Sequence, residues 1–287
     1  MSKPIDLLRP LVLNVGLSRH EANWNWKNVN SPFMRLFLVM EGNARVHMPD
    51  TTLDLSPGHL YFIPAFVTHS YECNGLFTHY YLHLYEEDGN DTRLLNDWQL
   101  PYCVDAGELE LLLMEELCKD NPELRLPASD PDTYDNSSTL MQNVMLNKSR
   151  PLSRKVQSRG AVLILMSRLL QHARPVDTDM DRRIAAAIEY IMVHTREELP
   201  VEELAANACM TKDYFIRLFR KHTGQTPQQY IIRKKMERAQ LLLITSDAPI
   251  KQIAEELGYY DHSYFNRVFR KNVGTTPMLY RTKTNMV

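Results

Sequence analysis

The sequence is poor in the features that mark secreted, disulfide-rich or membrane-spanning proteins. Its four cysteines, Cys73, Cys103, Cys118 and Cys209, include no CxxC pair, so neither a zinc site nor a disulfide framework is indicated. The longest apolar runs, such as 161–166, are far shorter than the roughly 20 residues that cross a bilayer. The first residues lack the basic start and apolar stretch of a signal peptide. We therefore expect a cytoplasmic protein without membrane contact.

The overall charge is also nearly balanced, at −2, but the two parts of the chain differ. Residues 181–287 hold 17 Lys and Arg against 12 Asp and Glu, whereas residues 1–180 hold 16 against 23. A basic C-terminal third predicts an anionic ligand for that part. With 287 residues, 44% of them hydrophobic, the chain is long enough for two domains with separate cores.

The first part, about 10–105, has the pattern of a small β-barrel or sandwich. Short runs rich in β-branched and aromatic residues are separated by turn residues at intervals of eight to twelve positions. The expected strands are 35–40, 44–48, 60–63 and 78–85.

Helical periodicity begins at Glu108–Cys118 and returns at Val156–His172. The Pro-, Asp- and Ser-rich stretch 120–138 between them is typical of a loop, and the polar stretch 174–180 is typical of a linker. The apolar faces of the helices 107–119 and 156–172 are too wide for isolated surface helices. We expect them to pack on the barrel and to form a dimer.

The C-terminal third contains an internal repeat. Residues 211–230 read TKDYFIRLFRKHTGQTPQQY, and residues 261–280 read DHSYFNRVFRKNVGTTPMLY. Ten of the twenty aligned positions are identical, far more than chance supplies, so the unit is duplicated. The identical pairs are Tyr214/Tyr264, Phe215/Phe265, Arg217/Arg267, Phe219/Phe269, Arg220/Arg270, Lys221/Lys271, Gly224/Gly274, Thr226/Thr276, Pro227/Pro277 and Tyr230/Tyr280.

Each copy has the signals of a capped helix. Thr211 and Asp261 are N-cap residues whose side-chain oxygens can accept hydrogen bonds from free amides, and Gly224 and Gly274 can supply a left-handed stop. A short helix and a tight turn precede each copy, as in a helix-turn-helix. The two expected units are about 200–222 and 250–272.

The faces of the second helix in each unit divide by chemistry. An inward face is formed by Phe215, Leu218 and Phe219, and in the second copy by Phe265, Val268 and Phe269. The outward face carries groups that can read base edges or contact phosphates. These candidate DNA-binding residues are Lys212, Asp213, Ile216, Arg217, Arg220, Lys221, His262, Ser263, Asn266, Arg267, Arg270 and Lys271.

The stretch 263–280, with the helix Ile250–Gly258 before it, closely resembles the AraC/XylS family of bacterial regulators. The resemblance covers about 100 residues and implies two helix-turn-helix units in one subunit, joined by a long helix. Gln228–Ile244 would be that connector, with apolar residues buried between the two halves, namely Ile232, Met236, Ala239 and Leu243. Carried over to this chain, the readers are Asp213, Ile216 and Arg217 in the first recognition helix and Ser263, Asn266 and Arg267 in the second. Ile216 departs from the family pattern, which often has a polar residue there, and this implies partly apolar readout.

Residues 54–64, with their Pro-Gly turn, followed by His69, resemble a cupin strand pair. Many AraC-type regulators carry such a barrel as their effector domain, often for sugars. Aromatic residues that can stack on a sugar ring, together with His69, give the candidate effector residues Trp24, Trp26, His69, Tyr71 and Tyr80. Cupins can also bind metals, but the paired-histidine and glutamate cluster of metal cupins is absent around 41–47, so we expect no metal and no cofactor.

These observations predict an α+β protein with two domains. Residues 1–173 form a cupin-like, effector-binding and dimerisation domain, 174–180 a linker, and 181–287 an all-α DNA-binding domain with two helix-turn-helix units. The expected function is ligand-responsive transcriptional regulation, with double-stranded DNA, a small-molecule effector such as a sugar, RNA polymerase and a second copy of the chain as partners. Two alternatives remain open: a cupin-type metalloenzyme whose C-terminal helices serve assembly, and a regulator whose N-terminal half only dimerises.

Overall fold

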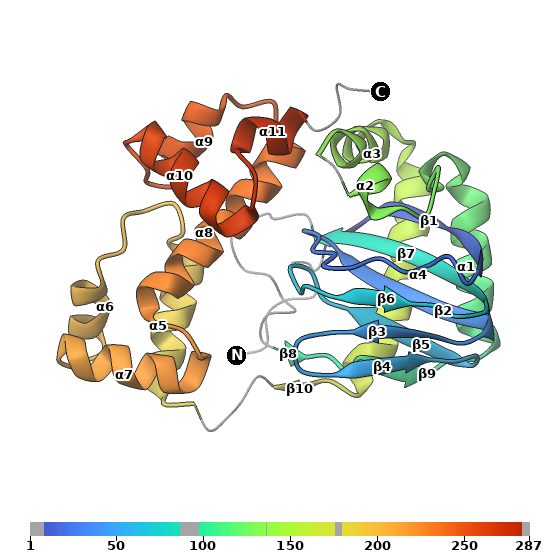
Figure 1. Ribbon diagram of the computed structural model, residues 1–287, viewed down its shortest axis with the longest axis horizontal. Helices are drawn as coiled ribbons and strands as arrows, with labels where there is room; N and C mark the ends of the chain where they lie inside the picture. Colours follow the sequence, from blue (N-terminus) through green and yellow to red (C-terminus); the bar gives the residue numbers. More distant parts are fainter. Residues whose placement is uncertain (1–8, 87–97, 136, 176–179, 283–287) are drawn as a thin grey trace. The chain divides into compact units, whose positions relative to one another are not determined.

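The computed structural model describes residues 9–86, 98–135, 137–175 and 180–282 (Figure 1). The chain divides into two compact units, the first ending at Pro175 and the second beginning at Val176. This boundary falls inside the predicted linker, of which 176–179 lie outside the described residues. Among the helices that the structure describes, none is long and apolar enough to cross a bilayer.

The N-terminal unit contains two facing antiparallel sheets (Figure 1). The larger has the strand order β1-β7-β2-β5-β9, and the smaller has the order β4-β3-β6. Their strands are β1 (Pro10–Glu21), β2 (Met34–Gly42), β3 (Ala44–His47), β4 (Thr52–Leu55), β5 (His59–Ile63), β6 (Ser70–Glu72), β7 (Leu76–Glu86) and β9 (Cys103–Asp105). A short ladder joins β8 (Trp98–Gln99) to β10 (Arg174–Pro175). The strands predicted at 35–40, 44–48, 60–63 and 78–85 are confirmed as β2, β3, β5 and β7.

Both faces of the larger sheet are buried, because side chains alternate along each strand. On β7, Phe77 and Tyr81 point into a core between the two sheets. Leu82 and Leu84 point the other way, into a core that the helices cover. The strand is therefore apolar or aromatic at almost every position.

In the part of the chain that the structure describes, five helical segments follow β9, and two of them, α1 and α4, pack on the outer face of the larger sheet. They are α1 (Glu108–Asp120), η3 (Pro122–Leu124), α2 (Pro131–Tyr134), α3 (Ser137–Ser149) and α4 (Leu152–Gln171). The prediction of an unstructured loop over 120–138 was wrong in part, because η3 and α2 lie within it. Helix α3 was not predicted, because its apolar residues do not form one stripe; Asn147 instead fixes it by donating to the Val12 carbonyl of β1 over 2.6 Å.

The C-terminal unit is all-α, as the sequence predicts. Its helices are α5 (Arg182–Val193), α6 (Val201–Asn207), α7 (Lys212–Thr223), α8 (Pro227–Thr245), α9 (Ile250–Glu256), α10 (His262–Val273) and α11 (Pro277–Thr282). Two separate cores form, one around α5, α6 and α7 and the other around α9 and α10. Helix α8 contributes to both cores and is therefore the connector.

The connector is divided along its length. Tyr230 and Ile231 belong to the first core, whereas Met236, Ala239 and Leu243 belong to the second. The predicted apolar residues of the connector are thus buried against the second half and not shared between the halves, and Ile232 is only partly buried. The N-terminal end of α8 therefore packs into the first core, and the rest of the helix packs into the second.

A buried lysine ties the connector to both halves. Lys235 of α8 is 5% exposed and donates to the carbonyl of Glu197 over 2.6 Å and to that of Leu257 over 2.7 Å. Leu257 is the C-cap of α9, where unpaired carbonyls need donors. Glu197 lies in the loop between α5 and α6. Burial lowers the pKa of Lys235 to about 8.

Replacing Lys235 with Met is expected to lower the free energy of unfolding of the C-terminal unit by about 2 kcal/mol, because two buried carbonyls lose their donor. The deficit should widen as pH rises from about 8 toward 10.5, the ordinary lysine value. In that window the unfolded chain binds more protons at this group than the folded chain, so the contribution of Lys235 to stability rises with pH in the wild type and is absent from the variant.

The measurement is denaturant unfolding followed by circular dichroism over this pH range. Lys251→Met on the exposed surface of α9 is the control and should change stability by less than about 0.5 kcal/mol. A deficit that is the same at every pH would contradict the burial of a titrating ammonium group.

Gly42 closes the hairpin between β2 and β3 in a conformation that only glycine adopts easily. Its φ is +75°, and a Cβ on it would collide with the backbone carbonyl of Leu76. Gly58 has a similar φ of +82°, but a Cβ there would meet no atom within 4 Å. A side chain at position 58 would therefore meet backbone strain alone, whereas one at position 42 would meet both strain and a steric collision.

Gly42→Ala is expected to lower the stability of the N-terminal unit by about 3 kcal/mol, since strain and collision add. Gly58→Ala should lower it by only about 1 kcal/mol. Unfolding followed by tryptophan fluorescence isolates this unit, because it holds all three tryptophans, Trp24, Trp26 and Trp98. Equal losses in the two variants would show that the hairpin accommodates a side chain at position 42.

Candidate nucleic-acid interface

Each half of the C-terminal unit contains a helix-turn-helix. In the first, α6 leads through a turn at Cys209, with φ +53°, into α7; in the second, α9 leads through Gly258, with φ +74°, into α10. Both second helices end at a left-handed glycine, Gly224 or Gly274, as predicted. The helices have the same lengths in the two halves, 7 and 12 residues, but the turn between them is 208–211 in the first half and one residue longer, 257–261, in the second.

The N-caps of the two second helices differ. Asp261 accepts hydrogen bonds from the amides of Ser263 over 2.8 Å and Tyr264 over 3.1 Å, as predicted. Thr211 lies at the N-cap position with extended backbone, but its side chain accepts no capping hydrogen bond. Both residues therefore occupy the N-cap positions that were predicted. The predicted capping hydrogen bond forms at Asp261 but not at Thr211.

The inward faces hold the second helices in place. Phe215 and Phe219 of α7 are fully buried, and their ring centroids lie 5.6 Å apart. Phe265 and Phe269 of α10 are also fully buried, and their ring centroids lie 5.9 Å apart. Tyr230 of α8 lies edge-on to Phe219 at 5.5 Å. Tyr280 of α11 has the same relation to Phe269 at 5.6 Å. The repeat in sequence is thus a repeat in packing.

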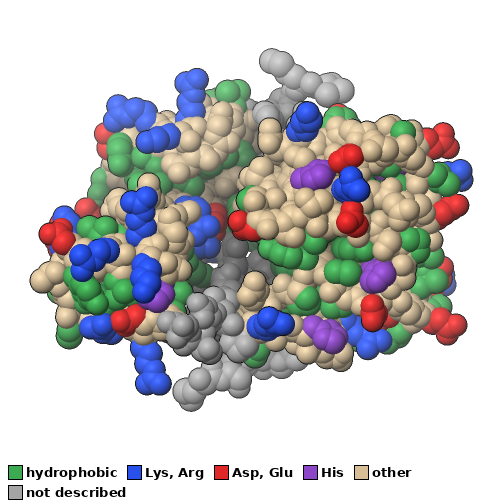
Figure 2. Space-filling view, turned by 60° about the horizontal axis from the view of Figure 1, so that its bottom comes forward, with side chains coloured by type: hydrophobic (Ala, Val, Ile, Leu, Met, Phe, Trp, Pro, Cys, Tyr) green, Lys and Arg blue, Asp and Glu red, His purple; other side chains and the backbone are tan. Residues whose placement is uncertain are grey.

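The outward faces carry the candidate DNA-binding residues. Ten of the twelve are exposed: Lys212, Asp213, Arg217, Arg220, Lys221, His262, Ser263, Arg267, Arg270 and Lys271. Ile216 is half-buried and packs against the first core, and Asn266 is half-buried with its amide 3.4 Å from His262 Nδ1. Figure 2 shows that Lys and Arg side chains gather on the C-terminal unit, at the left of the view, with few acidic side chains among them.

One arginine on each outward face stands over a tyrosine one turn earlier. The guanidinium carbon of Arg217 is 5.4 Å from the ring centre of Tyr214, and that of Arg267 is 5.9 Å from the ring centre of Tyr264. Both tyrosines are exposed. This contact limits the conformations of a long side chain before any DNA is bound. Sequence reasoning missed the two tyrosines as interface residues, although their identity in the repeat was a usable signal.

Lys212 is already engaged by a neighbouring carboxylate. Its ammonium group forms an ion pair with Glu202 of α6, which raises the pKa of Lys212 and lowers that of Glu202. An approaching phosphate would have to compete with Glu202 for this lysine. The charge of Lys212 is therefore already partly compensated within the protein.

Four of the five candidate effector residues lie in the core between the sheets. Trp24 stacks on Tyr71 with ring centroids 4.0 Å apart, and His69 Nε2 is 2.8 Å from the Tyr71 hydroxyl. Trp26 is partly buried against the same core. Tyr80 is not with them, because it lies on the opposite face of β7 among the residues that pack under the helices.

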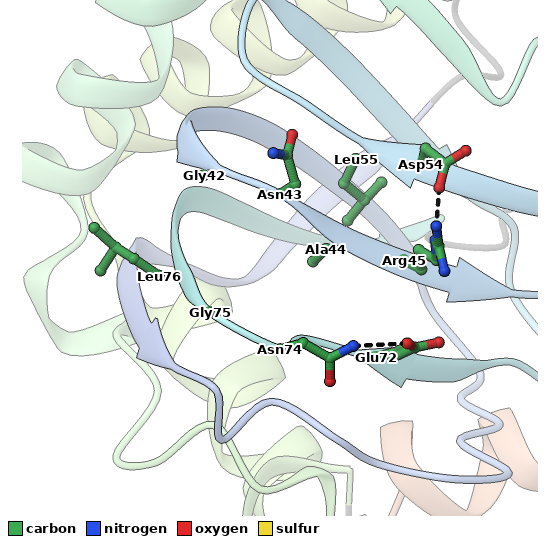
Figure 3. Close-up of a pocket in the computed structure, with 10 residues that line it drawn as sticks. All are labelled: Gly42, Asn43, Ala44, Arg45, Asp54, Leu55, Glu72, Asn74, Gly75 and Leu76. Atoms are coloured by element: carbon green, nitrogen blue, oxygen red, sulfur yellow. Dashed lines mark hydrogen bonds and ion pairs between the residues drawn. The ribbon is translucent and has the colours of Figure 1, made fainter.

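A separate depression of about 550 Å³ lies where the β2–β3 hairpin meets the turn between β6 and β7 (Figure 3). Its polar rim includes an Arg45–Asp54 ion pair of 2.8 Å and a 2.8 Å hydrogen bond from Asn74 to Glu72. It contains none of the five candidate effector residues. Over the described ranges, no group of three or more His, Cys, Asp or Glu side chains is placed to hold a metal ion.

Comparison with known proteins supports the nucleic-acid assignment. Residues 204–283 match the family described as "Helix-turn-helix domain". The probable transcriptional regulator LumQ of Photobacterium leiognathi is 24% identical over 80% of this chain and 82% of its own length. The regulatory protein PocR of Salmonella typhimurium is 35% identical, but the match covers 38% of this chain and only 36% of PocR.

A solved structure is similar over the same region. The DNA-binding domain of AdpA, the global transcriptional factor, in complex with a target DNA, is 34% identical over 35% of this chain and 91% of that chain, with a TM-score of 0.34. The match to the family model spans both helix-turn-helix units and the connector α8 between them. This chain is a transcriptional regulator that carries an AraC-type helix-turn-helix DNA-binding domain.

Proposed function

We propose that α7 and α10 enter the major groove of duplex DNA and that their outward side chains read it. The observation that carries this is the repeated arrangement of an exposed arginine over a tyrosine on a helix fixed by two buried phenylalanines. Arg217 and Arg267 suit guanine, and Asn266 suits adenine. Arg220, Lys221, Arg270 and Lys271, one turn further along, suit phosphates. Ile216 then serves packing at least as much as readout.

We further propose that residues 1–173 bind a small-molecule effector and join two copies of the chain. Helices α1 and α4 support the second part. Leu152 and Val156 of α4 are 76% and 62% exposed, and Leu112 of α1 is 57% exposed, so these helices offer large apolar side chains to a second copy. A second copy that covers them would form a homodimer.

A sugar stacked among Trp24, Trp26, His69, Tyr71 and Tyr80 has less support. Trp24 and Tyr71 already use their ring faces on each other, so a sugar would have to separate them. Tyr80 would have to come from another layer of the unit. A regulator whose N-terminal half only dimerises is the second candidate, because the core between the sheets is filled by stacked rings.

Binding to genomic fragments tests the function directly. Full-length protein is mixed with fragmented genomic DNA, and the retained fragments are sequenced and compared for a shared motif. A shared motif that outcompetes random DNA is expected. Retention without any shared motif would contradict sequence-specific regulation.

Arg267→Ala should weaken binding to the selected site by roughly 1–3 kcal/mol and relax the preference at one or two base pairs. Lys271→Ala, the matched control, should weaken selected and random DNA alike and reduce the salt dependence of binding. Mobility-shift titrations on the selected site, on single-base variants of it and on random DNA give both numbers. If Arg267→Ala loses affinity equally on all three, then Arg267 contacts phosphate and does not read bases.

Val156→Glu should convert a dimer into a monomer, because a charge would be buried in the proposed interface. Val156→Ala is the control and should leave the dimer intact. Light scattering after gel filtration distinguishes the 33.4 kDa monomer from twice that mass. An unchanged mass in the glutamate variant would remove α4 from the interface.

A further inference from the structure

The N-terminal unit buries an arginine that the fold alone does not account for. Arg35 of β2 has a side chain only 1% exposed and lies between the two sheets. Charged side chains are almost never fully buried unless every donor finds an acceptor. Arg35 therefore needs acceptors inside the protein or from a bound molecule.

Only one edge of the guanidinium is used by the protein. Arg35 Nη2 donates to Asp135 Oδ2 over 3.3 Å and to the Ser31 hydroxyl, which itself donates to Asp135. Among the residues that the structure describes, Arg35 Nε and Nη1 have no hydrogen-bond acceptor. The ring of Phe33 lies 4.5 Å from the guanidinium carbon and offers no lone pair. The Tyr134 side chain also interacts with the Arg35 guanidinium, but within the described part of the chain Nε and Nη1 are left without an acceptor at hydrogen-bond distance.

Apart from Asp135, the titratable groups near Arg35 are uncharged. Burial, and next the charge of Arg35, lower the pKa of His69 to about 3 and hold that of His83 well below its usual range. Burial raises the pKa of Tyr71 to about 12, so its hydroxyl keeps its proton. Neutral imidazoles and phenols can donate or accept. A few such groups around one fixed charge are typical of a small-molecule site.

We propose that Arg35 is the anchor for a carboxylate-bearing effector and that Asp135 occupies this anchor while no effector is bound. The inference rests on the proposed function, since it names the chemical class of the effector. The planar guanidinium fork matches a carboxylate in two parallel hydrogen bonds, and the internal partner is itself a carboxylate. Of the groups named around this site, only Arg35 is cationic, so a singly charged carboxylate matches its charge better than a doubly charged phosphate does.

Asp135 is placed to be exchanged. Its side chain is 9% exposed while that of Arg35 is 1%, so Asp135 is the more accessible member of the pair. Asp135 directly follows α2, whose Tyr134 is buried beside His83 with ring centroids 5.2 Å apart. An effector carboxylate that replaces Asp135 therefore also releases the end of α2 from the barrel. The shift is limited by the difference in affinity between the two states.

Removal of the internal carboxylate tests the exchange without knowledge of the effector. Asp135→Ala in the full-length chain leaves Arg35 without its counterion and creates space for one small carboxylate. The probes are sodium formate, formamide as its uncharged analogue and inorganic phosphate, each at constant ionic strength. The readout is the midpoint of thermal unfolding by tryptophan fluorescence, because all three tryptophans lie in this unit.

Asp135→Ala should unfold several degrees below the wild type, and formate should restore the loss in a saturable way, as ligand linkage requires. Formamide should not. The wild type should need at least about tenfold more formate for the same shift, because Asp135 competes at the anchor. Arg45→Gln, which removes an exposed arginine paired with Asp54, is the matched control and should behave as the wild type.

The double variant Arg35→Met/Asp135→Leu removes both charges and should fold, since apolar replacement of a buried pair is often tolerated. It should not respond to formate. A response in the double variant, or no restoration in Asp135→Ala, would overturn the proposal. Restoration by phosphate but not by formate would overturn the carboxylate class. If Asp135→Ala does not fold, Asp135→Asn takes its place with the same expected outcomes.

Affinity for the selected DNA site, measured in parallel, separates the two levels of inference. If the wild type binds the selected site and Asp135→Ala does not respond to formate, then Arg35 is not a carboxylate anchor, but the proposed regulatory function stands. A wild type without sequence preference refutes the regulator, whatever formate does. The two failures are therefore distinguishable.

Discussion

The burial of two phenylalanines one turn apart, on each recognition helix, is the constraint on which the DNA-binding unit depends. Phe215 and Phe219 fix which face of α7 points inward, and Phe265 and Phe269 do the same for α10. Because an α-helix is rigid on this scale, fixing one face also fixes the opposite one. The exposed arginines are therefore placed by the core and not by their own contacts. The tyrosine beneath each arginine refines an orientation that the phenylalanines set.

The C-terminal unit could be predicted well because its signals are local. A ten-residue identity, the glycines that end the helices and the phenylalanine spacing all act within about 20 residues of one another. The predictions that were wrong in the C-terminal unit concern details of geometry that local patterns do not fix. The Thr211 cap is not formed, and the connector residues from Met236 to Leu243 serve one core only. Lys235 lies four residues from both Ile231 and Ala239, on the apolar stripe of α8, so a charged residue there was a signal that could have been used.

The N-terminal unit was predicted in outline only, because its decisive contacts join distant parts of the chain. Strands β2, β3, β5 and β7 follow from short patterns, but α3 is fixed through Asn147 to β1, some 135 residues away. Arg35 meets Asp135 across 100 residues, and neither residue has a local pattern that suggests the other. The candidate effector set mixed residues from two different cores, since sequence alternation does not reveal which core a given tyrosine faces.

The two recognition helices are alike in packing but not in outward chemistry. The first presents Asp213 and Arg217, and the second presents Ser263, Asn266 and Arg267, in an order that the chain fixes. A pair of identical readers related by a two-fold axis recognises a palindrome, whereas two different readers in one chain do not. A site read by one copy of this protein therefore has a polarity, like an arrow on the DNA. Reversing the site under one copy would therefore reverse the orientation of that copy on the DNA.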